Sequence, residues 1–205
     1  FILSKPGAPE ADLIAALGFV EGPPNTHPGQ GTANRRFFFQ NFGLELLFVE
    51  DEKEARDGPA AGLRIPDRVT HSGASPFGLI ARHDDGDDLE PFPSWRYYPQ
   101  YFEAEQYFSV GSNSETLEEP LCVCMPKTLP DAPSNLRKPN SHLTLASLQL
   151  SVPTNQPSKA LDAMVACDLV SLQLNMAHHM VLVFNEGSSG NSKDLLPVLP
   201  LTVYW

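Results

Sequence analysis

An internal repeat limits how this chain can fold more strongly than any other feature of its sequence. Leu-Ser-Lys-Pro at residues 3–6 recurs as Leu-Ser-Val-Pro at residues 150–153, and a proline and a short predicted helix follow each copy. Residues 37–52 then align without gaps onto residues 172–187. Such a duplication indicates two copies of one structural unit, predicted as β-α-β-β-β. Since one unit alone leaves an apolar sheet face uncovered, the two units are expected to pair.

Residues 31–49 predict a β-hairpin with one acidic side chain set into it. Two apolar, strand-forming runs flank a Gln-Asn-Phe-Gly turn, in which Asn and Gly tolerate positive φ. Because side chains alternate along a strand, Leu44 and Leu46 share one face, and Glu45 lies on the other, which is also largely apolar. A buried carboxylate needs a cation, a metal or strong hydrogen-bond donors. Glu45 is therefore either a functional acid or, if the strand is at a sheet edge, a residue that faces water.

The chain divides into three parts that are expected to form one compact α+β domain. Residues 1–56 and 141–205 are the two repeat units, and they are predicted to build a curved mixed sheet around a central cavity. Residues 57–140 are predicted as an aromatic-rich insertion with extra strands, which ends in a proline-rich linker between the units.

Two segments outside the predicted strands supply candidate pocket residues. Residues 91–107 are dense in aromatic side chains and include Trp95, Arg96 and Tyr101. This segment either forms a pocket wall with stacking surfaces and a cation, or packs its rings onto the core. The Gly- and Pro-rich loop before the hairpin contains His27, which is either a site residue or a solvated loop histidine.

The composition excludes several classes of protein. The net charge of −11, from 25 acidic and 14 basic residues, argues against a nucleic-acid binder and against binding to an anionic membrane surface. No apolar run is long enough to span a bilayer. Three cysteines form no even disulfide set, which favours a reducing compartment, so we expect a cytoplasmic protein. The sequence opens inside a predicted strand without Met, so further residues are expected upstream.

Four short motifs resemble those of a known family. They are His-Pro-Gly-Gln-Gly-Thr-Ala-Asn at residues 27–34, Gly-Leu-Glu-Leu at residues 43–46, Lys-Pro-Asn at residues 138–140 and Leu-Pro-Val-Leu-Pro-Leu at residues 196–201. With the paired β-α-β-β-β plan, they resemble the glyoxalase-like domain family of the vicinal oxygen chelate superfamily, which includes glyoxalase I, extradiol dioxygenases and bleomycin-resistance proteins. The resemblance implies the fold more strongly than the reaction, since this scaffold supports many chemistries.

The resemblance also implies where a metal would be bound. Metal-dependent relatives take four ligands from the first and last strands of each unit, and Glu45 matches one of these positions. In the second unit the matching positions fall near residues 146–147 and at Met180, which are poor ligands for a divalent metal. His142 or His179, which lie nearby, would have to complete the site. We therefore expect a degenerate metal site: no cofactor is certain, and a divalent metal is an open alternative.

Two kinds of function follow from the resemblance. The first is a small-molecule metabolic enzyme of lyase, isomerase or dioxygenase type, with Glu45 as general base or sole acidic metal ligand. Thr32, Asn34 and Arg35 would then position substrate oxygens. The second is a binding or sequestering protein of the bleomycin-resistance type, in which Glu45 is a polar anchor beside aromatic walls. No Gly-x-Ser-x-Gly motif supports a Ser-His-Asp hydrolase. A homodimer is an open alternative. The residues predicted to contact the small molecule are His27, Thr32, Asn34, Arg35, Trp95, Arg96, Tyr101 and Met180.

Overall fold

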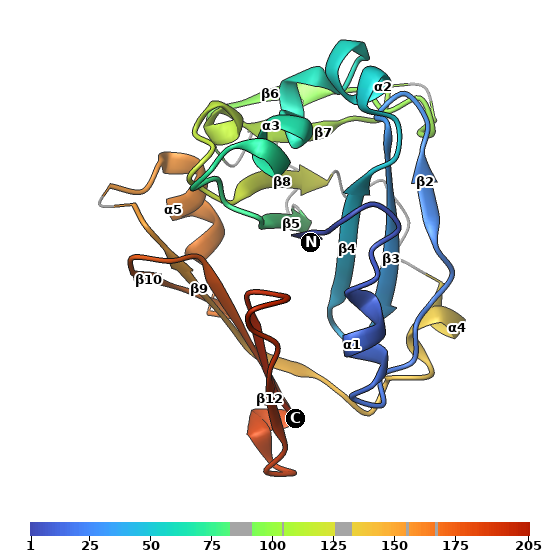
Figure 1. The fold of residues 1–205 in the computed structure, drawn as a ribbon, viewed down its shortest axis with the longest axis vertical. Coiled ribbons are helices and arrows are strands. Elements are labelled where there is room, and N and C mark those ends of the chain that lie inside the picture. The colour runs from blue at the N-terminus through green and yellow to red at the C-terminus, as the bar shows by residue number, and fades with distance from the viewer. Residues whose placement is uncertain (83–91, 104, 126–132, 155, 167) are drawn as a thin grey trace.

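The chain folds into a mixed α+β structure in which strands outnumber short helices (Figure 1). The computed structural model describes residues 1–205 except 83–91, 104, 126–132, 155 and 167. The described strands form three mixed sheets. The predicted α+β class is therefore confirmed. None of the helices in this part of the chain has the length and apolar character that a membrane crossing would require.

The first sheet contains the predicted hairpin. Its strands are β1 (Ile2–Leu3), β2 (Asn25–His27), β3 (Thr32–Phe38) and β4 (Gly43–Val49), with α1 (Ala11–Ala15) between β1 and β2. The order is β1-β4-β3-β2, and β1 runs parallel to β4 while the other pairs are antiparallel. The hairpin register places Arg36 opposite Glu45 and Asn34 opposite Leu47.

The second sheet is built from the segment predicted as an insertion. Its strands are β5 (Gly78–Arg82), β6 (Ser94–Tyr97), β7 (Phe108–Gly111) and β8 (Leu121–Met125). The order β5-β8-β7-β6, with β5 parallel to β8, repeats the order and the directions of the first sheet.

The first two sheets meet edge to edge. Ile2 of β1 forms an antiparallel bridge with Phe77, the residue before β5. The Leu3 N–H donates to the Pro76 carbonyl at 2.7 Å, and the Gly78 N–H donates to the Phe1 carbonyl at 3.1 Å. Backbone hydrogen bonds of this kind continue one sheet into the next, so β1 and β5 join two four-stranded sheets.

The third sheet differs in topology from the first, although their sequences repeat. Its elements are β9 (Leu145–Val152), α5 (Lys159–Val165), β10 (Val170–Leu174), β11 (His179–Phe184), η3 (Asn185–Gly187), β12 (Ser192–Asp194) and β13 (Leu201–Tyr204). The order is β10-β9-β11-β13-β12. The strands that flank α5 are therefore neighbours, whereas the strands that flank α1 lie at opposite edges of the first sheet. The sequence repeat is not matched by a repeat of strand order.

The larger apolar core lies between the third sheet and one face of the first two. Leu44 and Leu46 belong to it, and the rings of Phe39 and Phe184 pack with their centroids 4.4 Å apart. Complete burial of such a side chain contributes roughly 2–3 kcal/mol. A smaller core contains Leu47, so both faces of β4 are covered. The predicted alternation along this strand is confirmed, and the alternative of an edge strand whose Glu45 faces water is wrong.

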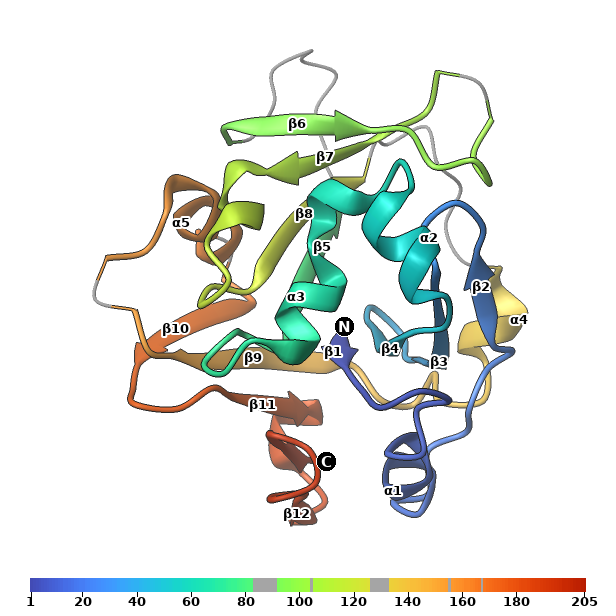
Figure 2. The same ribbon diagram turned by 45° about the horizontal axis from the view of Figure 1, so that its top comes forward.

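Three short helices close one end of the smaller core. They are α2 (Glu52–Asp57), η1 (Ala61–Leu63) and α3 (Ile65–Thr70), at the end of the molecule opposite α1 and β12 (Figures 1 and 2). Leu63 and Ile65 pack against residues of β7 and β8 in this core. The remaining helical segments are η2 (Ser112–Glu115) and α4 (Ser134–Arg137).

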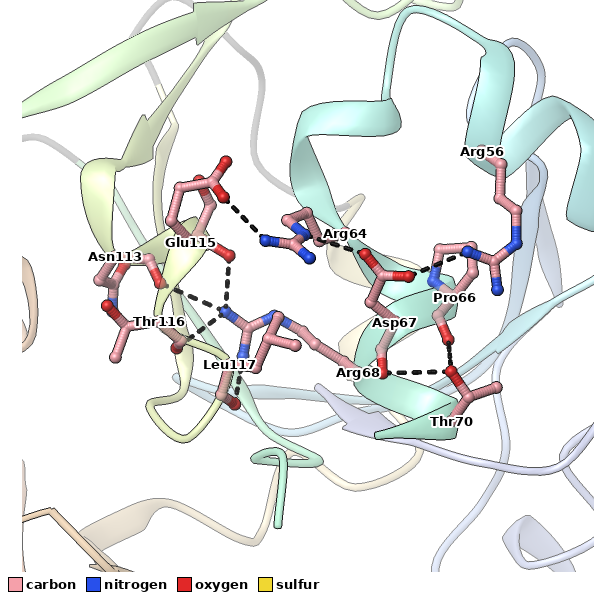
Figure 3. A network of polar contacts seen from close by, with 11 residues as sticks. Arg56, Arg64, Pro66, Asp67, Arg68, Thr70, Asn113, Glu115, Thr116 and Leu117 are labelled. Atoms are coloured by element: carbon pink, nitrogen blue, oxygen red, sulfur yellow. Dashed lines mark hydrogen bonds and ion pairs between the residues drawn. The ribbon is translucent and has the colours of Figure 1, made fainter. Parts of the chain in front are cut away.

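Arg68 anchors α3 to the second sheet (Figure 3). Its guanidinium is almost completely buried and donates hydrogen bonds of 2.6–3.4 Å to backbone carbonyls. The acceptors are the carbonyls of Asn113, Ser114, Thr116, Leu117 and Glu119. Burial lowers the pKa of Arg68 to about 10, which still leaves it charged at neutral pH. Arg68 therefore holds a fixed positive charge against the carbonyls of this loop.

Candidate active site

A cavity of about 770 Å³ lies against the face of the first two sheets that carries Glu45. Its wall includes residues 43–45 of β4 and residues 78–82 of β5. Because consecutive strand residues point to opposite faces, a cavity that touches every residue of such a run reaches both faces of the strand. Leu44 and Met180 of the larger core accordingly line it. Aromatic side chains from residues 97–108 also line the cavity.

Glu45 lies on this wall, and among the described residues one side chain donates a hydrogen bond to it. Asn34 Nδ2 donates to Glu45 Oε2 at 3.0 Å. Asn34 is 1% exposed, and its Oδ1 is a buried acceptor without a partner among the described residues. The pair thus presents a carboxylate to the cavity and holds an unsatisfied carbonyl oxygen behind it. Both oxygens are acceptors, so hydrogen-bond donors, such as a water or a ligand hydroxyl, would satisfy them.

A chain of four side chains leads from the aromatic wall to His27. The Tyr101 hydroxyl donates to Gln30 Oε1 at 3.1 Å, and Gln30 Nε2 donates to Thr32 Oγ1 at 2.8 Å. Thr32 Oγ1 lies 2.9 Å from His27 Nδ1. Burial raises the pKa of Tyr101, so that hydroxyl keeps its proton and remains the donor at the start of the chain.

The direction of this chain assigns the tautomer of His27. Thr32 is 1% exposed, and its hydroxyl already accepts the Gln30 amide hydrogen. Among the described residues, the acceptor within hydrogen-bond distance of its own hydrogen is His27 Nδ1, and a buried hydroxyl hydrogen left unpaired is costly. Nδ1 is then unprotonated, and the proton of the neutral imidazole is on Nε2. Burial lowers the pKa of His27, partly offset by the nearby negative charge of Glu45, and this also favours the neutral ring.

Glu54 of α2 holds the loop that carries Gln30. Its carboxylate accepts the Gly29 N–H at 2.9 Å and the Gly31 N–H at 2.8 Å. Gly31 has φ of +66°, and a side chain at this position would collide with the Asp51 carbonyl. Only glycine fits both constraints. Gln30 is therefore fixed through both of its neighbours, which orients its amide between Tyr101 and Thr32.

The structure brings together some of the predicted site residues and separates others. His27, Glu45 and Tyr101 line the cavity, and Thr32 and Asn34 lie behind them in direct contact with His27 and Glu45. Met180 also reaches the cavity wall but belongs to the larger core, together with Leu44 and Leu46.

Arg35, Trp95 and Arg96, which were predicted as contacts of the small molecule, do not line this cavity. Arg35 points to the other face of β3, where it forms an ion pair of 2.6 Å with Glu21. Trp95 Nε1 donates to Ser114 Oγ at 3.3 Å, beside a separate hollow near η2. The Arg96 guanidinium stacks over the ring of Tyr107, at 4.4 Å from its centroid.

The ligand set predicted for a divalent metal does not assemble at Glu45. His179 Nε2 lies 2.9 Å from Thr202 Oγ1 within the third sheet, and His142 is exposed, so neither lines the cavity. Across the described ranges, no three His, Cys, Asp or Glu side chains are grouped closely enough to hold a metal ion. Glu45 with one amide donor does not fit a structural or catalytic divalent-metal site, which normally has at least three protein ligands.

Several cavity residues were not predicted from the sequence. Gln30 lies inside the motif of residues 27–34 but was not predicted as a contact. Arg36 and Arg137 also line the cavity. Arg36 could have been found by counting the hairpin register, which places it opposite Glu45. Arg137 comes from a distant segment, and no local pattern marks it.

Comparison with known proteins gives limited information. No protein-family model matches the chain, and no curated protein sequence matches it. One solved structure, the crystal structure of a hypothetical protein from Staphylococcus aureus, is similar, with a TM-score of 0.52 and 8% sequence identity. The match covers 98% of this chain and 96% of the other. At this identity the similarity concerns the fold alone.

Proposed function

We propose that this protein is a small-molecule enzyme of isomerase or lyase type that moves a proton on the carbon next to a carbonyl group. One observation carries the proposal: the Glu45 carboxylate and the neutral His27 ring line the same cavity. A carboxylate can act as general base, and an N–H donor can stabilise the oxygen on which charge develops. The pairing of these two roles is a known solution for this class of reaction.

The proposed reaction needs no group beyond these side chains. The C–H bond next to the carbonyl breaks, and its proton passes to the Glu45 carboxylate. The electron pair of that bond forms a C=C bond, and the carbonyl oxygen becomes an enolate oxygen. His27 Nε2–H donates a hydrogen bond to that oxygen, and the protonated Glu45 then returns the proton to the same or a neighbouring carbon. Gln30, Thr32 and Tyr101 act as positioning residues that keep the proton on Nε2.

We also propose that the scaffold is related to the vicinal oxygen chelate superfamily. The shared order of the first two sheets, each with its edge strand parallel to its last strand, supports this. The paired modules in this proposal are residues 1–49 and 78–125, with residues 141–205 as a covering sheet. The connection between β5 and β6 includes residues 83–91, which lie outside the described part of the chain.

Solvent hydrogen exchange tests the proposed function. A panel of small ketones, aldehydes and 2-oxo acids is incubated with the protein in D₂O, and loss of the proton next to the carbonyl is followed by proton NMR. We expect exchange above the buffer rate for at least one compound. Glu45→Gln should lower that rate at least about 100-fold, a typical effect of removing a general base.

The variant Glu50→Gln makes the same chemical change at an exposed position of the same segment and should retain the wild-type rate. Exchange that persists in Glu45→Gln would refute the role of Glu45. Binding of panel compounds without exchange by the wild type would refute the proposed reaction and identify a sequestering protein instead.

A further inference from the structure

The cavity has the opposite charge balance to the rest of the chain. The sequence has 25 acidic and 14 basic residues. Among the described side chains that line the cavity, the acidic one is Glu45 and the basic ones are Arg36, Arg82 and Arg137. A concentration of arginines in an acidic protein indicates a local potential that attracts an anion.

Arg36 is held in place and keeps donors for a ligand. Its guanidinium lies over the Phe38 ring, 5.1 Å from the centroid, and its Nε donates to the Pro23 carbonyl at 3.1 Å. Both Nη groups have no partner in the described part of the chain. Arginine that is oriented by stacking and by one backbone hydrogen bond loses little freedom when it binds a carboxylate through two parallel hydrogen bonds.

Arg137 approaches from a different element. It lies at the end of α4, beside the hairpin turn, and its Nη1 donates to the Phe39 carbonyl at 3.0 Å. This bond fixes one end of the guanidinium beside the hairpin turn, and Arg137 lines the cavity together with Gly43 at the start of β4. Two arginines from separate parts of the chain therefore reach one cavity, each with a backbone carbonyl as anchor.

The register of the hairpin sets the size of the ligand. Arg36 and Glu45 are opposite each other on neighbouring strands, where Cβ atoms are about 4.5–5.5 Å apart. In a ligand that contacts both side chains, the anionic group bound by Arg36 is therefore only a few bonds from the carbon next to Glu45. A single carboxylate suits this site better than a phosphate dianion, because the charge of Glu45 opposes additional negative charge nearby.

We propose that the substrate is a small carboxylic acid in which the carboxylate is directly bonded to the reacting carbonyl, as in a 2-oxo acid with an apolar side chain. Arg36, supported by Arg137, binds the carboxylate. The apolar side chain lies against the aromatic wall around Tyr97 and Phe108. This inference rests on the proposed function, since it identifies the substrate class of the same site.

Calorimetric titration tests the inference with a matched pair of probes, 4-methyl-2-oxopentanoate and its uncharged methyl ester. We expect the acid to bind at least about tenfold more tightly than the ester, which corresponds to the loss of one charge-assisted pair. Arg36→Met should weaken binding of the acid by a similar factor and leave binding of the ester unchanged. Arg137→Met, measured in parallel, should also weaken binding of the acid and provides a second test if Arg36→Met fails to fold.

Lys53→Met removes one positive charge from an exposed position of α2 and is the matched control. Equal affinity for the acid and the ester would overturn the inference. The inference would also be overturned if Arg36→Met and Arg137→Met bound the acid as tightly as Lys53→Met does. Failure of the wild type to bind the acid would overturn it too. Arginine-dependent binding of the acid without solvent exchange would support this inference and refute the proposed reaction. Glu45-dependent exchange of a neutral ketone that binds as tightly as the acid would support the proposed reaction and overturn this inference.

Discussion

Replacing Thr32 with Val is the most direct test of the hydrogen-bond chain behind His27. Valine has almost the same shape as threonine, so the backbone of β3 and the packing around it should be unchanged. The substitution removes one hydroxyl that accepts from Gln30 Nε2 at 2.8 Å and lies 2.9 Å from His27 Nδ1. It therefore breaks the chain in the middle without opening a cavity.

The expected loss of stability follows from the two groups that lose their partner. A buried polar group left without a hydrogen bond costs about 1–3 kcal/mol. Gln30 and His27 are 8% and 9% exposed, so water can reach them only in part. We expect Thr32→Val to lower the free energy of unfolding by about 2–4 kcal/mol. Thr32→Ser keeps the hydroxyl and loses one methyl group, which should cost about 1 kcal/mol.

Two measurements check this reasoning. Urea denaturation gives the difference in unfolding free energy between the two variants and the wild type. Long-range proton–nitrogen NMR spectra of the His27 ring show which nitrogen carries the proton. The wild type and Thr32→Ser should have it on Nε2, and Thr32→Val should show a mixture of tautomers. A proton on Nδ1 in the wild type, or equal stability of the two variants, would refute the assigned direction of the chain.

Three further outcomes can be measured by denaturation. Arg68→Met should destabilise the fold by about 3–5 kcal/mol, because it removes the donor to a set of buried carbonyls, whereas Arg64→Gln at the surface should have a much smaller effect. Burial lowers the pKa values of His27 and His178, so the unfolded chain binds more protons below pH 6.5. The free energy of unfolding should therefore fall as the pH drops below 6.5. His27→Asn should make this fall with pH less steep, and an unchanged pH dependence in the variant would contradict the prediction. Asn140→Ala should cost about 2–4 kcal/mol, since its amide makes three hydrogen bonds of 2.8–3.1 Å to backbone groups more than a hundred residues away; a loss under 1 kcal/mol would contradict this.

Only part of the site was predictable from local periodicity. Alternation along one strand placed Glu45 opposite the core face. His27 was predicted from its loop, and Thr32 and Asn34 from what the family resemblance implies. Arg35 was predicted at the site, although alternation in β3 places its neighbour Arg36 there instead. Residues 35 and 36 point to opposite faces of β3, so the hairpin register decides which of the two arginines reaches the cavity.

The parts that were not predictable depend on contacts between distant segments. Residues 1–56 and 141–205 resemble each other in local sequence. Local sequence does not determine which strand edges meet. Here β1 meets β5, and the second sheet comes from the segment predicted as an insertion. Trp95 and Tyr101 illustrate the same limit, because only their tertiary contacts decide that Tyr101 reaches Gln30 and Trp95 reaches Ser114.

The two-sided burial of β4 explains how one hairpin serves both stability and a site. Leu44 and Leu46 contribute to the core that the third sheet covers, and Leu44 also reaches the cavity wall. Glu45 lies on the other face, half-buried, and among the described residues its hydrogen-bond donor is the Asn34 amide. Taking a carboxylate partly out of water with one such donor costs free energy, which an apolar residue at this position would not. The cost is accounted for if the carboxylate meets a ligand in the cavity, which is the premise on which both proposals rest.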